Sequence, residues 1–173
     1  MRFDFFGNNH PAAISWTASG ASVGLLALDR NGDGRITNGF ELFSNVTPQP
    51  GNAATHLGFK ALAMYDRRYY GGNDDGVIDA KDAVFTKLRV WIDRNHNGVS
   101  EPGELLNMNQ AGIQSIFIHY IYSNWRDQYG NRFQYRAQIK WSDPNRRNGN
   151  AQGSGGGRAQ WAFDVVLLSA KGH

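Results

Sequence analysis

The spacing of a twelve-residue calcium loop occurs in the stretch Asp93-Arg94-Asn95-His96-Asn97-Gly98-Val99-Ser100-Glu101-Pro102-Gly103-Glu104. Such a loop takes side-chain oxygens from positions 1, 3 and 5, a backbone carbonyl from position 7 and a bidentate acid from position 12, with glycine at position 6 for the sharp turn. Gly98 stands at position 6, and position 8, which is usually apolar, is Ser100. The predicted metal ligands are Asp93, Asn95, Asn97, the carbonyl of Val99, and Glu104.

A second stretch with this spacing begins at Asp29, nearer the start of the chain. Its position 12 is Phe40, and the acid comes one place late at Glu41, so a slightly wider loop has to close on that residue. The predicted ligands are Asp29, Asn31, Asp33, the carbonyl of Arg35, and Glu41.

A degenerate third stretch lies between these two and ends at Asp82. Its predicted ligands are Asn73, Asp75, the carbonyl of Val77, and Asp82. Position 1 is Gly71, which has no side-chain oxygen. The acid that could fold back to supply it is Asp66, which precedes an insertion at residues 67–70.

The alternative interpretation of these stretches is metal-free Asx turns, because clusters of Asp, Asn and Gly form tight turns by themselves. Three clusters between residues 29 and 104, two of them closed by Glu, favour metal. Magnesium demands stricter octahedral geometry, and zinc or copper would not choose an all-oxygen set. The expected cofactor is therefore Ca²⁺, with two or three ions bound.

Composition gives one domain of 173 residues, 40% of them hydrophobic, with a formal net charge of +3. There is no cysteine, which excludes disulfides and thiolate metal sites. No apolar run approaches the ~18 residues of a membrane span, and no signal peptide is visible. We expect no membrane association and a monomer.

Hydrophobic periodicity predicts an α+β fold, with short strands over residues 1–17, a helical middle that carries the EF-hand-like loops, and a C-terminal antiparallel sheet. Helices are expected at residues 55–67, 79–88 and 104–110. Strands are expected at 113–122, 132–141 and 161–168, where the alternation over 132–141 is uninterrupted. The domain organisation is thus a single calcium-binding domain over 1–173, with the calcium-loop region at 29–104 and the sheet at 113–168, interrupted by a Gly-rich mobile loop at 146–158.

Three segments, residues 26–43, 75–85 and 88–116, resemble the calcium-binding self-processing module of RTX-type secreted bacterial proteins. Their order and spacing cover about residues 3–120, whereas residues 126–136 look closer to uncharacterised bacterial proteins described only as EF-hand-containing. The resemblance implies a secreted or cell-surface protein. It also implies calcium-promoted cleavage of an Asp-Pro bond at the N-terminal edge of the module. The pair near that edge here is His10-Pro11, and the sequence has its Asp-Pro at Asp143-Pro144.

These observations favour a calcium-binding structural module that folds or is stabilised on calcium. One alternative is the self-processing module. Another is a binding module for acidic glycan or nucleic acid, through the basic residues Arg132, Arg136 and Lys140 and the nearby aromatic residues Tyr122, Trp125 and Tyr129. No Ser-His-Asp or G-x-S-x-G arrangement is apparent, which favours a non-enzymatic module and leaves self-cleavage open.

Overall fold

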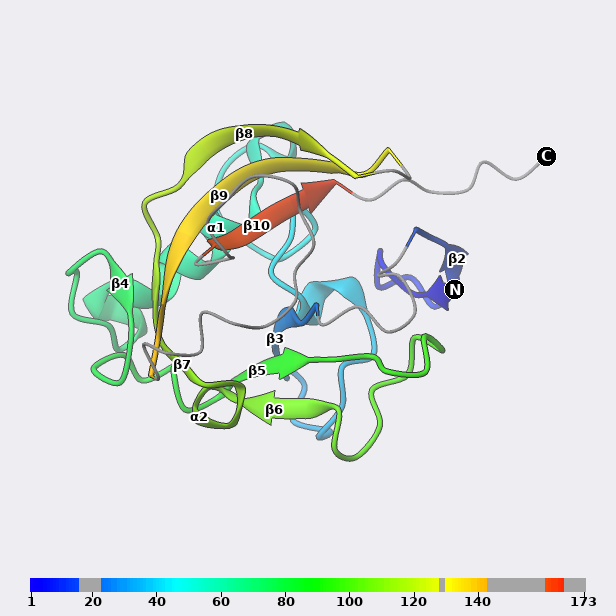
Figure 1. Cartoon of the computed structure of the whole chain (residues 1–173), viewed down its shortest axis with the longest axis horizontal. Helices are drawn as coiled ribbons and strands as arrows, with labels where there is room; N and C mark the ends of the chain where they lie inside the picture. Colours follow the sequence, from blue (N-terminus) through cyan, green and yellow to red (C-terminus); the bar gives the residue numbers. More distant parts are fainter. Residues whose placement is uncertain (16–22, 128–129, 143–160, 167–173) are drawn as a thin grey trace.

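The computed structural model describes residues 1–15, 23–127, 130–142 and 161–166. Three antiparallel sheets make up most of its regular structure (Figure 1). The smallest pairs β1 (Arg2–Phe3) with β2 (Ala12–Ala13), and the next has the order β3 (Leu25–Leu28), β5 (Leu88–Trp91), β6 (Leu105–Asn107). The largest has the order β10 (Trp161–Val166), β9 (Arg132–Trp141), β7 (Ile113–Phe117), β4 (Val77–Ile78), and β8 (Ile121–Arg126) also pairs with β9.

Helical structure is limited to short segments within the described residues. The α-helices are α1 (Gly58–Ala63) and α2 (Met108–Ala111), and the 3₁₀ segments are η1 (Gly39–Glu41), η2 (Ala53–Thr55), η3 (Met64–Asp66) and η4 (Arg68–Tyr70). The predicted α+β fold with a helical middle is therefore wrong, because the chain is mostly β.

Competing hydrogen bonds explain why the predicted helices are absent or short. In the segment 79–88, the N–H of Ala83 donates to the carbonyl of Gly71 at 2.9 Å, which removes it from a helical ladder, and successive turns lead into β5. In the segment 104–110, residues 105–107 pair with β5 as β6, and α2 begins only at Met108. Tertiary pairing thus overrides a helical spacing of apolar residues in both places.

The strand predicted at 132–141 is confirmed as β9, the longest strand among the described residues. It is the centre of the large sheet, because β10 pairs along one side while β8 and then β7 pair along the other. The expected single strand at 113–122 is therefore two strands that share one edge of β9. The predicted mobile loop at 146–158 lies outside the described residues.

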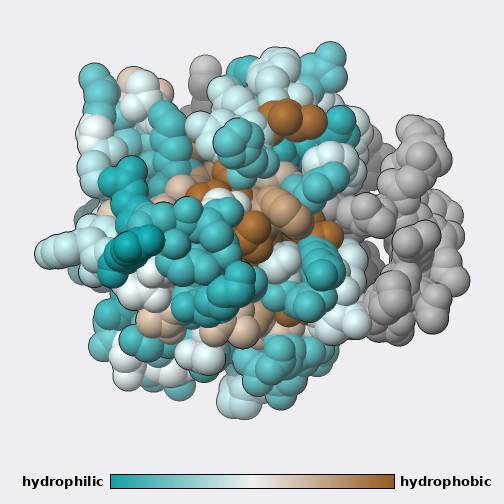
Figure 2. All heavy atoms as spheres, turned by 90° about the vertical axis from the view of Figure 1, so that its left-hand side faces the viewer, coloured by the Kyte–Doolittle hydropathy of each residue, from teal (hydrophilic) through white to brown (hydrophobic). Residues whose placement is uncertain are grey.

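Two hydrophobic clusters hold the sheets together. The larger joins the five-stranded sheet to α1 and α2 through Leu62, Ile78, Leu88, Met108 and Ile116. The smaller joins the N-terminal strands to the three-stranded sheet, with Phe3 against Trp91 at a ring-centroid distance of 5.6 Å. The face at the left of Figure 1 is mostly hydrophilic, with hydrophobic residues gathered near its centre (Figure 2).

Candidate metal centres

The loop that ends at Glu104 has two buried carboxylates that accept backbone hydrogen bonds. Asp93 is 5% exposed, and the N–H groups of positions 5 and 6 donate to its Oδ1 and Oδ2 at 3.2 and 2.9 Å. Glu104 is also 5% exposed and accepts from the N–H groups of positions 2 and 9 at 2.9 and 3.3 Å. The indole of Trp91 in β5 donates to Glu104 Oε2 at 3.4 Å. The two predicted ends of this loop therefore converge.

The amides at positions 3 and 5 of this loop are held by the acid at position 9. The Nδ2 groups of Asn95 and Asn97 donate to the two oxygens of Glu101 at 2.7 and 3.1 Å. Their Oδ1 atoms accept from backbone N–H groups inside the loop at 3.1 and 2.7 Å. Glu101 thus fixes both amides with their oxygens facing the loop, the orientation that a hard cation requires.

The loop that begins at Asp29 repeats these bonds. The N–H groups of positions 4 and 6 donate to Asp29 Oδ1 and Oδ2 at 2.7 and 2.8 Å. Glu41 is 2% exposed and accepts from the N–H groups of positions 2 and 9 at 3.2 and 2.7 Å, as Glu104 does. The extra residue is taken up by η1, which Asn38 caps through a hydrogen bond to the N–H of Phe40 at 2.9 Å. Glu41 therefore takes the position that Glu104 has in the third loop, although it comes one residue later in the sequence.

The middle loop takes its first acid from Asp66, which the sequence left outside the predicted ligand set. Asp66 is 6% exposed and accepts from the N–H groups of Asp75 and Gly76, positions 5 and 6, at 3.2 and 3.0 Å. The insertion closes on itself between them, since the N–H of Asp74 donates to the carbonyl of Asp66 at 2.7 Å. Gly71, at position 1 by spacing, ends η4 in a left-handed conformation, and its carbonyl accepts from the N–H of Ala83.

Asp82 closes the middle loop and is the most distinctive acid of the three loops. It is 2% exposed, and its Oδ2 accepts from the N–H of Asp79 at 2.8 Å. Its Oδ1 is buried and has no hydrogen-bond partner among the described residues. Burial, and then the negative charges of Asp66 and nearby carboxylates, raise the pKa of Asp82. A buried carboxylate oxygen without a donor fits a cation ligand, because such an oxygen otherwise costs free energy.

The ammonium group of Lys81 lies beside two carboxylates of the same loop. Its Nζ lies 2.9 Å from Asp75 Oδ2 and 3.7 Å from Asp79 Oδ2. The hydrogen bond from Lys81 is the main reason that the pKa of Asp75 is lowered. Asp75 is one of the predicted ligands, so a cation in this loop would compete with the lysine for that carboxylate.

A fourth turn of the same kind, which sequence reasoning did not relate to the predicted loops, begins at Asp4. The N–H groups of Asn8 and Asn9, at positions 5 and 6, donate to Asp4 Oδ1 and Oδ2 at 3.1 and 2.8 Å. Positions 4 and 6 have positive φ in all four turns, at 62° and 63° here. Position 3 is Phe6 and position 12 is Ser15, so this turn repeats the backbone geometry without the ligand set. The signal in the sequence was the Asn pair four and five residues after Asp4.

Within the described residues, no three His, Cys, Asp or Glu side chains converge as a metal cluster. The predicted loops do not require one, because each combines two or three acids with amide and backbone-carbonyl oxygens. The structure brings the ends of each loop together and leaves the filling of the predicted sites as a proposal.

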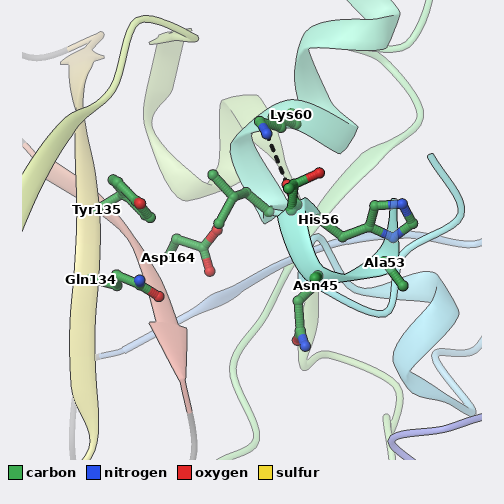
Figure 3. Close-up of a pocket in the computed structure, with 10 residues that line it drawn as sticks. Asn45, Ala53, His56, Lys60, Gln134, Tyr135 and Asp164 are labelled. Atoms are coloured by element: carbon green, nitrogen blue, oxygen red, sulfur yellow. Dashed lines mark hydrogen bonds between the residues drawn. The ribbon is translucent and has the colours of Figure 1, made fainter. Parts of the chain in front are cut away.

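A cavity of about 450 Å³ lies between the segment before α1 and strands β9 and β10 (Figure 3). Asp164 of β10 lies in its wall, and Asp164 Oδ2 accepts from the N–H of Gly58 at 2.7 Å. Leu57, at the N-cap of α1, has no side-chain oxygen, so Asp164 supplies the cap from a distant strand. Burial raises the pKa of Asp164. Lys60 donates to the carbonyl of Thr55 at 2.8 Å. The carboxylate of Asp164 and the ammonium of Lys60 are thus both bonded to backbone groups.

One basic residue of β9 stacks on an aromatic ring, and the neighbouring β8 carries exposed aromatic side chains. Arg136 stacks on Trp161, with Cζ 4.5 Å from the ring centroid. Tyr122 and Trp125 in β8 are 63% and 46% exposed, and neither β8 nor β9 contains an acidic residue. Tyr129, the third aromatic residue predicted for this surface, lies outside the described residues. The rings of Tyr122 and Trp125 pack on those of Tyr135 and Phe133, so a shared surface of these rings with the basic residues stays a prediction.

Comparison with known proteins gives the family. A family model of the SPM domain matches residues 1–151. The iron-regulated protein FrpA of Neisseria meningitidis serogroup C is 39% identical over 118 residues, which is 68% of this chain and 10% of FrpA. The chain therefore spans about a tenth of the length of that relative. None of the helices that the structure describes is long and apolar enough to cross a membrane. The chain belongs to the SPM domain family.

Proposed function

We propose that this SPM domain is a calcium-dependent self-processing module of an RTX-type bacterial protein. Calcium at the loops that close on Glu41, Asp82 and Glu104 stabilises the fold, and the folded domain promotes cleavage of an Asp-Pro bond on its N-terminal side. Membership of the SPM family favours this over a purely structural calcium module. Export to a medium with millimolar calcium would then be the trigger, since such concentrations fill even sites of ~10⁻⁴ M.

The observation that carries the calcium step is Asp82. Its Oδ1 is buried without a hydrogen-bond partner among the described residues, in a loop whose other end is the buried Asp66. Two buried carboxylates in one loop repel each other, and one oxygen of Asp82 has no donor among the described residues, which makes the metal-free loop unfavourable. A bound cation would supply the missing positive charge. Folding and binding are then linked, because the arrangement of Asp66 beside Gly76 exists only in the folded chain.

The cleavage step rests on the family and on the N-terminal segment of the fold. The backbone N–H of Gly39 donates to the carbonyl of Asp4 at 3.0 Å, and Phe3 packs on Trp91. The start of the chain is thus bound to the exit of the first calcium loop and to β5. Ordering of that loop would therefore also order whatever peptide bond enters the domain there.

The test is a fusion in which a carrier ending in Asp-Pro precedes residue 1. Calcium should raise the melting temperature and release the carrier, and mass spectrometry should place the break at the Asp-Pro bond. A junction with Asn-Pro is the matched control and should stay intact, and a chain with Asp93→Ala and Glu104→Ala should cleave only at higher calcium. A rise in melting temperature without cleavage would mean that the domain is a structural calcium module and does not process itself. A fragment that ends at Asp143 would move the processed bond to the other side of the domain.

The basic and aromatic residues on the surface of β8 and β9 support a second candidate function, the binding of an acidic polymer. Arg132 and Lys140 lie on β9, the exposed rings of Tyr122 and Trp125 lie on the neighbouring β8, and neither strand contains an acidic residue. Such a surface would bind single-stranded nucleic acid or acidic glycan by phosphate or sulfate contacts and ring stacking. Retention on heparin that falls steeply with salt would support it.

A further inference from the structure

The first and third calcium loops are joined through position 8 of each. The N–H of Ile36 donates to Ser100 Oγ at 2.7 Å, and Ser100 Oγ lies 3.3 Å from the carbonyl of Ile36, to which it donates. Ile36 is 2% exposed and Ser100 is 6% exposed. One hydroxyl therefore satisfies both backbone groups of a residue 64 positions away in the sequence.

The peptide group that meets Ser100 is also part of the first calcium loop. The carbonyl of Arg35 and the N–H of Ile36 belong to one planar amide. That carbonyl is the predicted position 7 ligand, so a bound ion would meet its oxygen, while the N–H at the other side of the same amide donates to Ser100 Oγ. On the third loop, Ser100 follows Val99 directly, and the carbonyl of Val99 is the position 7 ligand there.

The middle loop is anchored in another way. Its positions 7 and 8 form β4, and Val77 and Ile78 pair with Phe117 and Ile116 of β7. The loop is thus tied to the five-stranded sheet by backbone bonds, while Ser100 ties the other two loops to each other.

We propose that Ser100 is a positioning residue that couples the first and third loops, so that calcium at one raises the affinity of the other while the middle loop binds independently. This inference rests on the proposed calcium binding. An amide polarised by a cation at its oxygen donates more strongly from its N–H. The bond to Ser100 therefore strengthens when the first loop is occupied, and by linkage the third loop is held in its binding geometry.

Three glycine amides report the loops separately in an NMR titration of the whole chain with calcium. The N–H groups of Gly34, Gly76 and Gly98 each donate to the first acid of their own loop, at 2.8, 3.0 and 2.9 Å. Asp33→Ala removes an exposed ligand of the first loop only. It should raise the calcium midpoint of Gly98 by about fivefold, the lower end of usual coupling, and leave that of Gly76 unchanged.

The decisive comparison repeats Asp33→Ala together with Ser100→Ala. The Gly98 midpoint should then no longer respond to the loss of the first site, whereas Ser100→Thr, which keeps the hydroxyl, should preserve the response. The coupling is overturned if Asp33→Ala leaves the calcium midpoint of the Gly98 amide unchanged in the otherwise native chain. This comparison does not need Ser100→Ala, so it tests the coupling even if that variant does not fold. It is equally overturned if the response survives Ser100→Ala. Absence of any calcium shift at all three glycines would instead defeat the proposed calcium binding, and the coupling with it.

Discussion

Replacement of Asp82 by Asn should change stability in opposite directions with and without calcium. The carboxylate is 2% exposed and its Oδ1 has no donor within the described part of the chain. Asn is nearly isosteric, can place its carbonyl oxygen at the N–H of Asp79, and removes the buried negative charge. The metal-free protein should therefore gain stability, while the calcium-bound protein loses a charged ligand.

The two magnitudes follow from separate effects. A buried polar group without a partner costs ~1–3 kcal/mol and more when it is charged, so loss of the charge that Asp66 repels should stabilise the metal-free variant by about 1 kcal/mol, or about 2–4 °C in melting temperature for a chain of this size. Calcium at about a thousand times its Kd contributes about 4 kcal/mol per site. Most of that contribution should disappear for the middle loop, so the calcium-induced rise in melting temperature should shrink by roughly 8–16 °C.

The assay is thermal unfolding in chelator and in excess calcium, beside a matched control in the same loop. Asp74→Asn is that control, because Asp74 stands at position 4, its side chain is 50% exposed, and its carboxylate pairs with Arg68 at 3.1 Å. Asn also tolerates the positive φ of 60° at that position. The control should change little in either condition. If Asp82→Asn lowers the metal-free melting temperature, or leaves the calcium-induced rise intact, then Asp82 is a structural turn residue and the reasoning is refuted.

Three further predictions use other groups. Asp66→Ala removes the acceptor of two backbone N–H groups and should cost about 1–3 kcal/mol, and calorimetry should find one calcium ion fewer; unchanged stoichiometry would remove Asp66 from the site. Because burial raises the pKa of Asp164, this group stabilises the folded state less as the pH rises from its ordinary value of 3.8 through its raised pKa. Relative to Asp164→Asn, the native chain should therefore lose stability across that window in urea unfolding, and parallel curves would contradict the burial argument. Arg132→Ala with Lys140→Ala should release the chain from heparin at lower salt, and equal elution would exclude this surface.

The turns of the predicted loops could be located from the sequence because their geometry is local. The bonds from positions 5 and 6 to the acid at position 1 span at most five residues in the third loop, so the spacing alone fixes them. The spacing could suggest Asp66 but could not decide its role, since Asp66 takes the place of position 1 only after residues 67–72 fold back on themselves. Asp4 was missed for the opposite reason, because its turn keeps the backbone bonds but has Phe6 at a ligand position.

The helices failed where the partner lies far away in the sequence. The apolar residues of 105–107 have acceptable helical spacing, yet this segment pairs with β5 as a strand, and β5 in turn pairs with β3. The strand at 132–141 succeeded because its strict alternation has no helical alternative, although nothing in it predicts that two separate strands would share one of its edges.

The way the loops are anchored would divide the effect of the proposed calcium binding between the two larger sheets. The first loop follows β3, and the third loop connects β5 to β6, so both lie in the three-stranded sheet, where Ser100 joins them. The middle loop contains β4 and thereby extends the five-stranded sheet through Ile78 and Ile116. Both residues also belong to the larger hydrophobic cluster with Leu88 of β5, which is how the two sheets contact each other. Occupancy of the middle loop should therefore stabilise β7 and β9, while the coupled pair stabilises the N-terminal segment that packs on Trp91, next to the entry point of the bond proposed for cleavage.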